Sequence, residues 1–304
     1  MVGIMAISVM SIARHPPAVV LPSNTRVIDA VKLMNERSVR HAIVSNDGQK
    51  VDGLVSAKDI LNYLGGGEKF NILKELHRGD LHRALHSPIE PIVNKRPIVA
   101  KMTDSLPELM AVMAKHDIGM LPLLDEHSRI WGTLSERHLF KLFEGNQMFV
   151  KVFEVMSKPL ITLDTKATLL DLSRVMIGKD IRRIPIISEG RLWGIVTVKD
   201  IIRFLASGYV EEAINKGLSD YILNTNVSKI ATLNPKTVSP DVDLSDAVKI
   251  MNANNVGSLI VVSAGNPIGI LTERDLLLKL PKLRGVEFMA DVAKNRVIVG
   301  RIHF

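Results

Sequence analysis

Four short segments of the chain combine a hydroxyl group with a carboxylate at one fixed spacing. Each reads Gly, two mostly apolar residues, Ser or Thr, two variable residues and Asp, with His in place of Asp in the second. The segments are Gly53-Leu-Val-Ser-Ala-Lys-Asp59, Gly132-Thr-Leu-Ser-Glu-Arg-His138, Gly194-Ile-Val-Thr-Val-Lys-Asp200 and Gly269-Ile-Leu-Thr-Glu-Arg-Asp275. A strand that ends at the Ser or Thr, followed by a helix that opens at the Asp, places both groups above a helix N-terminus. The backbone N–H groups there can bind phosphate, and the carboxylate can accept both hydroxyls of a ribose. The alternative is that the Asp is only a helix N-cap.

These segments belong to a longer internal repeat. A methionine lies 18 or 19 residues before each Gly, and a β-branched residue follows each methionine by five positions. The methionines are Met34, Met113, Met176 and Met251, and the β-branched residues are Val39, Ile118, Ile181 and Val256. Self-similarity of this length indicates four copies of one structural unit.

Each copy has the pattern of a small α/β unit. In the third copy, residues 160–163 form a short β-rich run, and apolar residues then recur at helical spacing from Leu169 to Met176. Two further apolar runs, 184–187 and 192–198, flank the turn signal Glu189-Gly190. A second helix opens at Asp200, where an acidic residue suits the helix N-terminus. The sequence therefore predicts an α/β fold built from four βαββα units.

The unit resembles the CBS domain, named after cystathionine β-synthase, and the resemblance covers nearly the whole chain. The copies span about 13–64, 88–143, 150–206 and 227–280. In that family two domains pair into a Bateman module, so the resemblance implies one module over 1–148 and another over 149–304. It also implies a disc-like assembly similar to the nucleotide-sensing γ subunit of AMP-activated protein kinase. A length of 304 residues, at ~150 per domain, likewise suggests two domains.

Basic residues are unevenly distributed among the copies. Arg40-His41 and Arg182-Arg183 follow the β-branched residue in the first and third copies, where the second and fourth have Gly119-Met120 and Gly257-Ser258. The forked donors of guanidinium suit phosphate oxygens, and the resemblance implies phosphate contacts at this position. The alternative is a solvated basic edge.

The resemblance further implies composite sites, in which one copy supplies its hydroxyl, basic residue and Asp, and its module partner holds the base. Ser56, Lys58 and Asp59 would face Ile118, Gly119 and Leu121. Thr197, Lys199 and Asp200 would face Thr237, Val256, Gly257, Ser258 and Leu259. Thr272, Arg274 and Asp275 would face Thr162, Ile181, Arg182 and Ile184. Arg40, His41 and Arg183 complete the expected phosphate-binding set.

The second copy departs from this pattern because His138 stands where the others have Asp, while Ser135 and Arg137 are kept. Imidazole cannot replace the two-oxygen acceptor of a carboxylate, so we expect at most three nucleotides per chain. A protonated His138, with a pKa near ~6.5, could attract phosphate. Alternatively, it could only pack against the following helix, 139–143.

Other chemistry has little support. The chain has no Cys, which excludes disulfides, thiolate zinc sites and Cys nucleophiles. Gly65-Gly-Gly67 lacks the preceding strand and following Lys-Ser/Thr of a phosphate loop, and the repeated Ser and Thr lack a paired His. We therefore expect no catalytic residues and no metal cofactor.

The leading interpretation is a non-catalytic sensor that binds AMP, ADP, ATP or a related adenosyl ligand and acts on a separate protein effector or a second copy of itself. The alternative is nucleic-acid binding by a basic surface, because the net charge is +7. The sequence, however, has no run of basic residues and few aromatic residues for base stacking.

Both ends of the chain carry apolar segments. Residues 1–13 are apolar and uncharged but too short to span a bilayer. They also lack the basic start of a signal peptide, so we expect a buried first element in a cytoplasmic protein without membrane contact. The C-terminal segment 296–304 reads as a strand.

Overall fold

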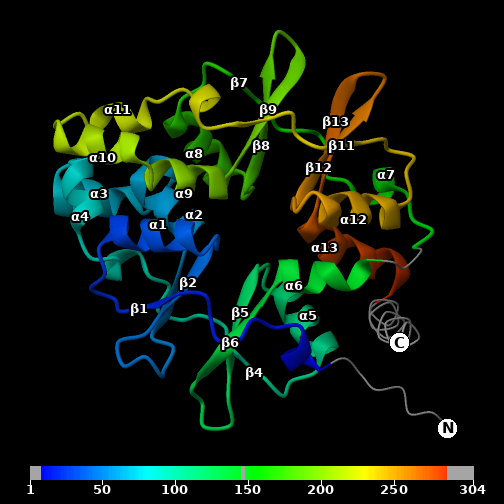
Figure 1. Cartoon of the computed structure of the whole chain (residues 1–304), viewed down its shortest axis with the longest axis horizontal. Coiled ribbons are helices and arrows are strands. Elements are labelled where there is room, and N and C mark those ends of the chain that lie inside the picture. The colour runs from blue at the N-terminus through cyan, green and yellow to red at the C-terminus, as the bar shows by residue number, and fades with distance from the viewer. Residues whose placement is uncertain (1–7, 145–147, 286–304) are drawn as a thin grey trace. The chain divides into compact units, whose positions relative to one another are not determined.

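The computed structural model of the chain describes residues 8–144 and 148–285, and all four repeats have the predicted order of strand, helix, strand, strand and helix (Figure 1). The first repeat contains β1 (Val20–Leu21), α1 (Val27–Glu36), β2 (His41–Val44), β3 (Gly53–Ser56) and α2 (Ala57–Leu61). The second contains β4 (Ala100–Lys101), α5 (Leu106–Lys115), β5 (Met120–Leu124), β6 (Ile130–Ser135) and α6 (Glu136–Phe140). The third contains β7 (Leu163–Asp164), α8 (Leu169–Gly178), β8 (Arg183–Ser188), β9 (Arg191–Thr197) and α9 (Val198–Leu205). The fourth contains β11 (Thr237–Val238), α12 (Leu244–Ala253), β12 (Ser258–Ser263), β13 (Asn266–Thr272) and α13 (Glu273–Arg284).

Each repeat forms its own small sheet. The first strand lies parallel to the second, and the second lies antiparallel to the third. In every repeat the first residue of the middle strand is the ladder partner of the Ser or Thr that ends the third strand. These partners are His41 and Ser56, Met120 and Ser135, Arg183 and Thr197, and Ser258 and Thr272. The repeated methionines Met34, Met113, Met176 and Met251 are all buried in the first helix of their repeat, so they are core residues.

Four segments that lead into the repeats are placed against a neighbouring repeat. We call them lead-in segments: residues 8–16, 88–97, 150–160 and 227–235. Each holds a short helix: η1 (Val9–Ser11), η3 (Glu90–Ile92), α7 (Val152–Val155) and η5 (Val227–Lys229). Each then pairs with the third strand of the neighbouring repeat at the residue after the repeated glycine. The pairs are Arg14 with Thr133, Asn94 with Leu54, Ser157 with Ile270, and Thr232 with Ile195, the last within the added strand β10 (Thr232–Leu233). Each lead-in segment therefore adds a bridge or a short strand to the sheet of the repeat with which it pairs.

The close approach of the lead-in segments explains the repeated glycines. A Cβ on Gly132 would lie 2.5 Å from the carbonyl oxygen of Arg14, and one on Gly194 would lie 3.0 Å from that of Thr232. Gly53 and Gly269 face the carbonyl oxygens of Asn94 and Ser157 in the same way. None of the four has the positive φ that favours glycine, so the lack of a side chain, not backbone freedom, accounts for them.

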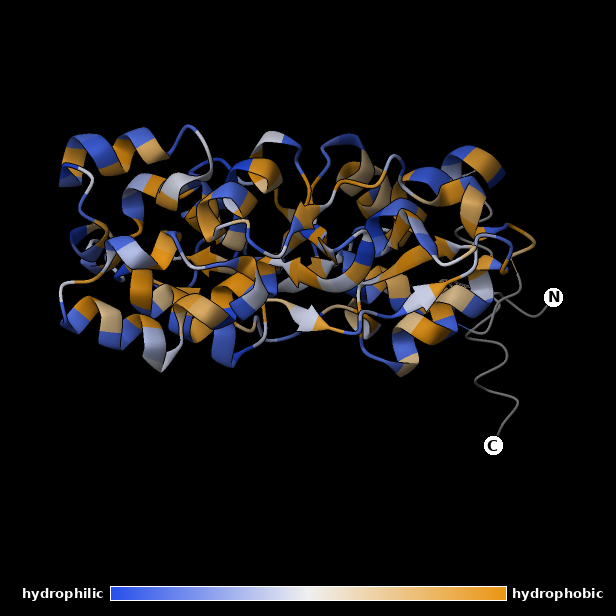
Figure 2. Cartoon of the chain, turned by 90° about the horizontal axis from the view of Figure 1, so that it is seen from above, coloured by the Kyte–Doolittle hydropathy of each residue, from blue (hydrophilic) through white to orange (hydrophobic). Residues whose placement is uncertain are grey.

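The chain divides into two compact units. Of the described residues, 17–97 and 161–235 form one unit with repeats 1 and 3, and 8–16, 98–144, 148–160 and 236–285 form the other with repeats 2 and 4. We call them the 1–3 unit and the 2–4 unit. Each has its own apolar core, and each core includes residues of two lead-in segments, such as Ile92 and Val227 in the first and Val9 and Val155 in the second. The helices carry apolar residues on one side and polar residues on the other (Figure 2). This grouping follows helix packing and is distinct from the predicted modules 1–148 and 149–304, which stay a prediction.

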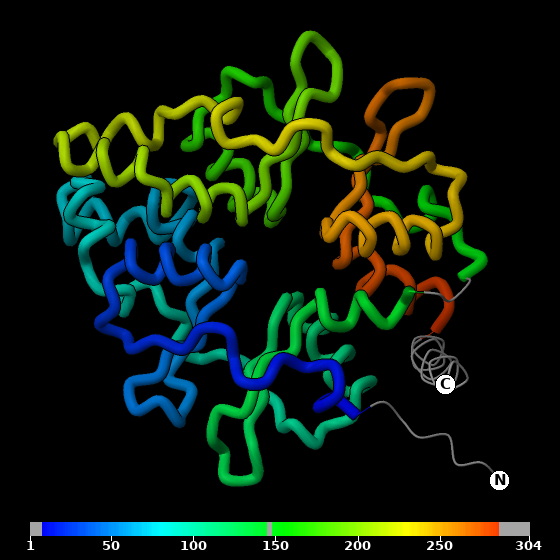
Figure 3. Tube along the Cα trace, in the orientation of Figure 1, coloured from blue at the N-terminus to red at the C-terminus, as the bar shows by residue number. Residues whose placement is uncertain are grey.

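Among the described residues, extra helices follow repeats 1 and 3. The π-helical turn η2 (Asn62–Gly66), α3 (Phe70–His77) and α4 (Leu81–His86) follow repeat 1, and α10 (Gly208–Asn215) and α11 (Asp220–Leu223) follow repeat 3. A polar hollow lined by Arg78, His82, Asn215 and Asp220 shows that the two insertions lie side by side in the 1–3 unit (Figure 3). A short 3₁₀ helix, η4 (Lys141–Phe143), extends α6.

Of the two apolar end segments predicted from the sequence, only part lies within the described residues. Val9 of the N-terminal segment is buried in η1, whereas the predicted C-terminal strand 296–304 lies outside the described residues. No helix within 8–144 and 148–285 is both long and apolar enough to cross a bilayer.

Candidate functional site

The hydroxyl and the carboxylate of the repeated motif meet at a helix N-terminus in repeats 1, 3 and 4. Ser56, Thr197 and Thr272 are the N-caps of α2, α9 and α13. In each case one carboxylate oxygen, Oδ2, accepts the backbone N–H of the cap residue at 2.8–2.9 Å and its hydroxyl at 2.6 Å. The predicted juxtaposition is therefore present, and the Asp has a capping role as well.

The other carboxylate oxygen, Oδ1, is engaged by residues that the sequence analysis did not single out. Oδ1 of Asp59 accepts Lys69 Nζ at 2.5 Å. Oδ1 of Asp200 accepts Arg203 at 2.5 Å and the Thr232 hydroxyl at 3.1 Å. Oδ1 of Asp275 accepts the Ser157 hydroxyl at 2.6 Å and Lys279 Nζ at 2.7 Å. Arg203 and Lys279, three and four residues after the Asp, could have been found from helical spacing. Ser157 and Thr232 could not, because they come from lead-in segments.

The start of the middle strand brings the basic residues of repeats 1 and 3 to the same edge of the sheet. The backbone N–H of Ala57 donates to the carbonyl of Arg40 at 2.9 Å, and that of Val198 donates to the carbonyl of Arg182 at 3.0 Å. Arg40 and Arg182 are thus beside the first residue of α2 and of α9, respectively. Repeats 1 and 3 therefore each bring a hydroxyl, a carboxylate and the backbone of an arginine to the start of one helix.

His41 does not add a positive charge to this edge at neutral pH. Burial, together with the positive charges of Arg40 and Arg182, lowers the pKa of His41 to about 3. The expectation that His41 acts as a cation is thus corrected, because a neutral imidazole can offer only a hydrogen bond. The influence of Arg182 on His41 also shows that repeats 1 and 3 bring their basic residues together.

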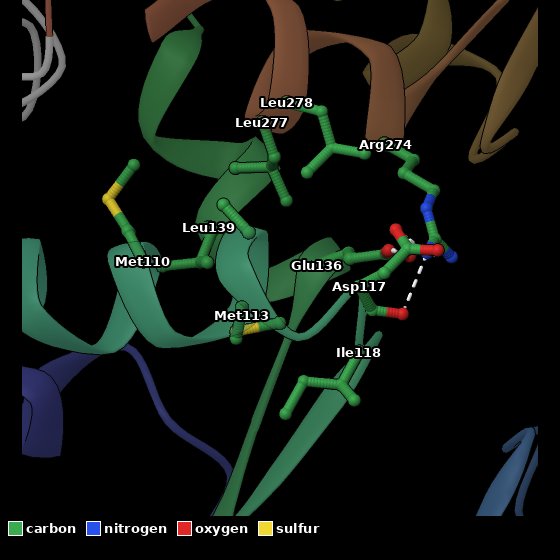
Figure 4. A pocket seen from close by; sticks show the side chains of 10 residues that line it. Met110, Met113, Asp117, Ile118, Glu136, Leu139, Arg274, Leu277 and Leu278 are labelled. Carbon is green, nitrogen blue, oxygen red and sulfur yellow. Dashed lines mark hydrogen bonds and ion pairs between the residues drawn. The ribbon is translucent and has the colours of Figure 1, made fainter.

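The basic residue that precedes the Asp makes ion pairs with the other repeat of its unit. Lys58 pairs with Asp180 of repeat 3, and Arg274 pairs with Asp117 of repeat 2 and donates to its carbonyl oxygen at 2.7 Å. Arg137 donates to Glu273 at 2.9 Å. Figure 4 shows the Arg274 side chain reaching Asp117 beside an apolar pocket of the 2–4 unit. Lys58 and Arg274, predicted as ligand contacts, thus hold repeats together in this structure.

Neighbouring positions give the two units different pairing chemistry. Glu136 and Glu273, each next to its motif's arginine, are 3% and 2% exposed in the 2–4 unit. The equivalent residues of the 1–3 unit are the buried apolar residues Ala57 and Val198. At this position, directly after the Ser or Thr of the motif, the unit of repeats 2 and 4 therefore buries a charged residue and the unit of repeats 1 and 3 buries an apolar one.

His138 takes over the capping role of the missing Asp. Its Nδ1 atom accepts the backbone N–H of Ser135 at 3.2 Å, so Nδ1 carries no proton. Burial, together with Lys141 and Arg14, lowers the pKa of His138 to about 4. The hypothesis of a protonated, phosphate-attracting His138 is therefore wrong at neutral pH.

We expect His138→Asp to add one nucleotide-binding event per chain, since the substitution restores the carboxylate at a preserved N-cap. Isothermal titration with AMP would measure the stoichiometry, and His138→Asn, which keeps an acceptor without the charge, is the matched control. An unchanged stoichiometry in His138→Asp would show that another feature, such as the nearby positive charge of Arg14, closes this position.

The predicted partners of the three motifs fall in the opposite compact unit. Ile118, Gly119 and Leu121 belong to the 2–4 unit, whereas Ser56, Lys58 and Asp59 belong to the 1–3 unit. The residues predicted for repeats 3 and 4 are divided in the same way. The 1–3 unit holds Thr197, Lys199 and Asp200, and their predicted partners in the 2–4 unit are Thr237, Val256, Gly257, Ser258 and Leu259. The 2–4 unit holds Thr272, Arg274 and Asp275, and their predicted partners in the 1–3 unit are Thr162, Ile181, Arg182 and Ile184. These composite pairings stay predictions.

The described residues contain no group of three or more His, Asp or Glu side chains arranged to hold a metal ion. His82 and His86 of α4 do form a His-x-x-x-His pair, which the sequence analysis did not use. Their rings lie 4.4 Å apart, and Nδ1 of His86 is bonded to the carbonyl of His82 at 2.8 Å.

Comparison with known proteins identifies the family. The CBS-domain model matches residues 9–66, 89–145, 152–207 and 227–282. The chain therefore belongs to the CBS-domain family and contains four tandem CBS repeats, as the sequence predicted.

Relatives match the chain along most of its length. An uncharacterized 33.4 kDa protein in a ribosomal RNA operon of Thermofilum pendens is 33% identical over 300 residues, covering 99% of this chain and all of the relative. Protein MJ1225 of Methanocaldococcus jannaschii is 28% identical over 276 residues, covering 90% and 99%. Its crystal structure, described as that of a candidate archaeal homologue of γ-AMPK, has a TM-score of 0.83 and covers 89% of this chain and 99% of that one. An uncharacterized conserved protein from Pyrococcus horikoshii, 18% identical with a TM-score of 0.56, shares the fold.

Proposed function

We propose that the protein is a non-catalytic regulatory protein that binds adenine nucleotides, or a related adenosyl ligand, at the carboxylates of Asp59, Asp200 and Asp275. The observation that carries this proposal is the threefold recurrence of one arrangement. Each Asp stands at the start of a helix beside a hydroxyl, in a chain of four CBS repeats. A carboxylate in this position suits a ribose diol.

The charges at the sheet edge support a phosphate-bearing ligand. Arg40 and Arg182 stand beside the N-termini of α2 and α9, where the helix dipole also favours an anion. The similarity to MJ1225 over nearly the whole chain agrees with this ligand class, since that protein is described as a candidate homologue of γ-AMPK. The bound ligand would favour one arrangement of the repeats, and an effector protein or a second copy would respond to it.

We expect AMP, ADP or ATP, or S-adenosylmethionine, to raise the melting temperature in a concentration-dependent manner, because a ligand that binds only the native state stabilises it. Differential scanning fluorimetry with each compound, and with inorganic phosphate as control, would measure this at low and high salt. No shift with any adenosyl compound at millimolar concentration would defeat the proposal. A response to oligonucleotides alone, lost steeply with salt, would favour nucleic-acid binding instead.

A further inference from the structure

The three aspartates differ in the number of polar groups, hydrogen-bond donors and cations together, that contact the carboxylate. A carboxylate has about four acceptor positions on its two oxygens. Asp200 accepts from four donors: the N–H and hydroxyl of Thr197, Arg203 and the hydroxyl of Thr232. Asp275 also has four partners: it accepts from the N–H and hydroxyl of Thr272 and from the hydroxyl of Ser157, and it forms an ion pair with Lys279 at 2.7 Å. Asp59 accepts from only three, the N–H and hydroxyl of Ser56 and Lys69.

Exposure follows the same division. The side chains of Asp200 and Asp275 are 7% and 5% exposed, whereas that of Asp59 is 24% exposed. The two carboxylates with four partners are therefore buried, and the one with three partners is partly exposed to solvent. A ribose diol needs two acceptor positions, and the number already occupied differs between Asp59 and the other two aspartates.

The fourth donor comes from one structural position. Ser157 and Thr232 both pair with the residue that follows the repeated glycine, Ile270 and Ile195. Each is a hydroxyl residue, and each donates to Oδ1 of the Asp that ends the same motif. Asn94 is the equivalent residue opposite Leu54 in repeat 1, and no hydroxyl is available there. Arg14 is the equivalent residue in repeat 2, where the carboxylate itself is replaced by His138.

We propose that Ser157 and Thr232 determine the affinity of two of the three sites, because their hydroxyls occupy the carboxylate position that a ribose hydroxyl would take. This inference rests on the proposed function. Ribose and the lead-in segment then compete for Oδ1 of Asp275 and of Asp200, and binding of the ligand releases the hydroxyl of the lead-in segment. At Asp59 one acceptor position is already open, and no hydroxyl of a lead-in segment has to be displaced.

The cations on Oδ1 separate the two competing sites further. Arg203 is 60% exposed, so it can leave Asp200 for water at little cost. Lys279 also donates to the carbonyls of Val155 and Met156 and to the hydroxyl of Ser157, at 2.9–3.1 Å. It thus ties Asp275 to the 150–160 lead-in segment. We expect Asp59 to bind the ligand most tightly, Asp200 less tightly and Asp275 least.

The experiment is isothermal titration of the full chain with adenosine and with AMP, comparing wild type with Thr232→Val, Ser157→Ala and the double variant. Each substitution removes a donor without adding a charge. We expect each to tighten one binding event about five- to tenfold, equivalent to one hydrogen bond, and the double variant to tighten two while the third is unchanged. Thr232→Ser keeps the hydroxyl and should bind as wild type does, and Ser228→Ala removes a hydroxyl elsewhere in the same lead-in segment and should have no effect.

The outcomes separate this inference from the proposed function. If wild type binds adenosine or AMP and Thr232→Val binds it equally or more weakly, the inference is wrong and the proposed function stands. If neither wild type nor any variant binds an adenosyl compound, the proposed function fails first. Thr232→Val keeps the shape of the side chain but loses one hydrogen bond to Asp200, so its melting temperature should fall slightly. It should stay folded at the temperature of titration, which keeps the comparison valid if the double variant does not fold.

Discussion

Gly132→Ala should lower the free energy of unfolding by about 2–3 kcal/mol, the upper range for overpacking a site with no room. The added Cβ would lie 2.5 Å from the carbonyl oxygen of Arg14, a backbone atom that cannot move without moving the lead-in segment. Such a shift would break the two hydrogen bonds between Arg14 and Thr133, each 2.9 Å long. It would also disturb Val9, which is buried in the core of the 2–4 unit. Urea denaturation followed by circular dichroism would measure the loss.

Gly178→Ala is the matched control, because Gly178 ends α8 and a Cβ there would meet no atom within 4 Å. Alanine is the better helix former by roughly 0.5–1 kcal/mol, so this variant should be at least as stable as wild type. Equal stabilities for Gly132→Ala and Gly178→Ala would show that the lead-in segment does not dock against Gly132 in solution.

The fold was predictable because the sequence repeats its local signals four times. Each strand, helix and turn of a unit is encoded by neighbouring residues, such as the run from Leu169 to Met176 and the Glu189-Gly190 turn. The pairing of the lead-in segments with a third strand was not predictable, since it joins residues as far apart in sequence as Arg14 and Thr133. Its only trace in the sequence was the unvarying glycine, which excludes a side chain without showing what comes close to it.

For the candidate site too, the contacts between residues near in sequence were predictable and those that depend on tertiary packing were not. The pairing of hydroxyl and carboxylate depends on three-residue spacing at a helix start, so Thr197 and Asp200 follow from the sequence. The partners of Oδ1 depend on tertiary packing, so the sequence pattern does not indicate Lys69, Ser157 and Thr232. The charge of His41 was misjudged for a related reason, because burial and neighbouring arginines set its pKa.

Asp200→Ala should weaken binding of AMP at one site by about 1.5–3 kcal/mol, the range for hydrogen bonds to a charged group, or roughly 10- to 150-fold. The control is Asp171→Ala. Asp171 forms the same capping box with Thr168 at the start of α8, with bonds of 2.7–3.1 Å, but it is exposed and accepts from no residue of a lead-in segment. It should therefore lose about 1 kcal/mol of stability, the usual cost of a cap, and bind all ligands normally.

The stability of Asp200→Ala tests the structure as well as the function. The loss of a cap alone would cost about 1 kcal/mol, but the carboxylate of Asp200 is buried and also accepts from Arg203 and Thr232. We therefore expect Asp200→Ala to lose more stability than Asp171→Ala, about 1–3 kcal/mol, since the half-buried Thr197 N–H and hydroxyl lose an ionised acceptor. Titration at a temperature where both variants remain folded separates the two effects. Normal AMP binding by Asp200→Ala, beside equal stability losses in both variants, would reduce the repeated Asp to a helix cap and remove the physical basis of the nucleotide site.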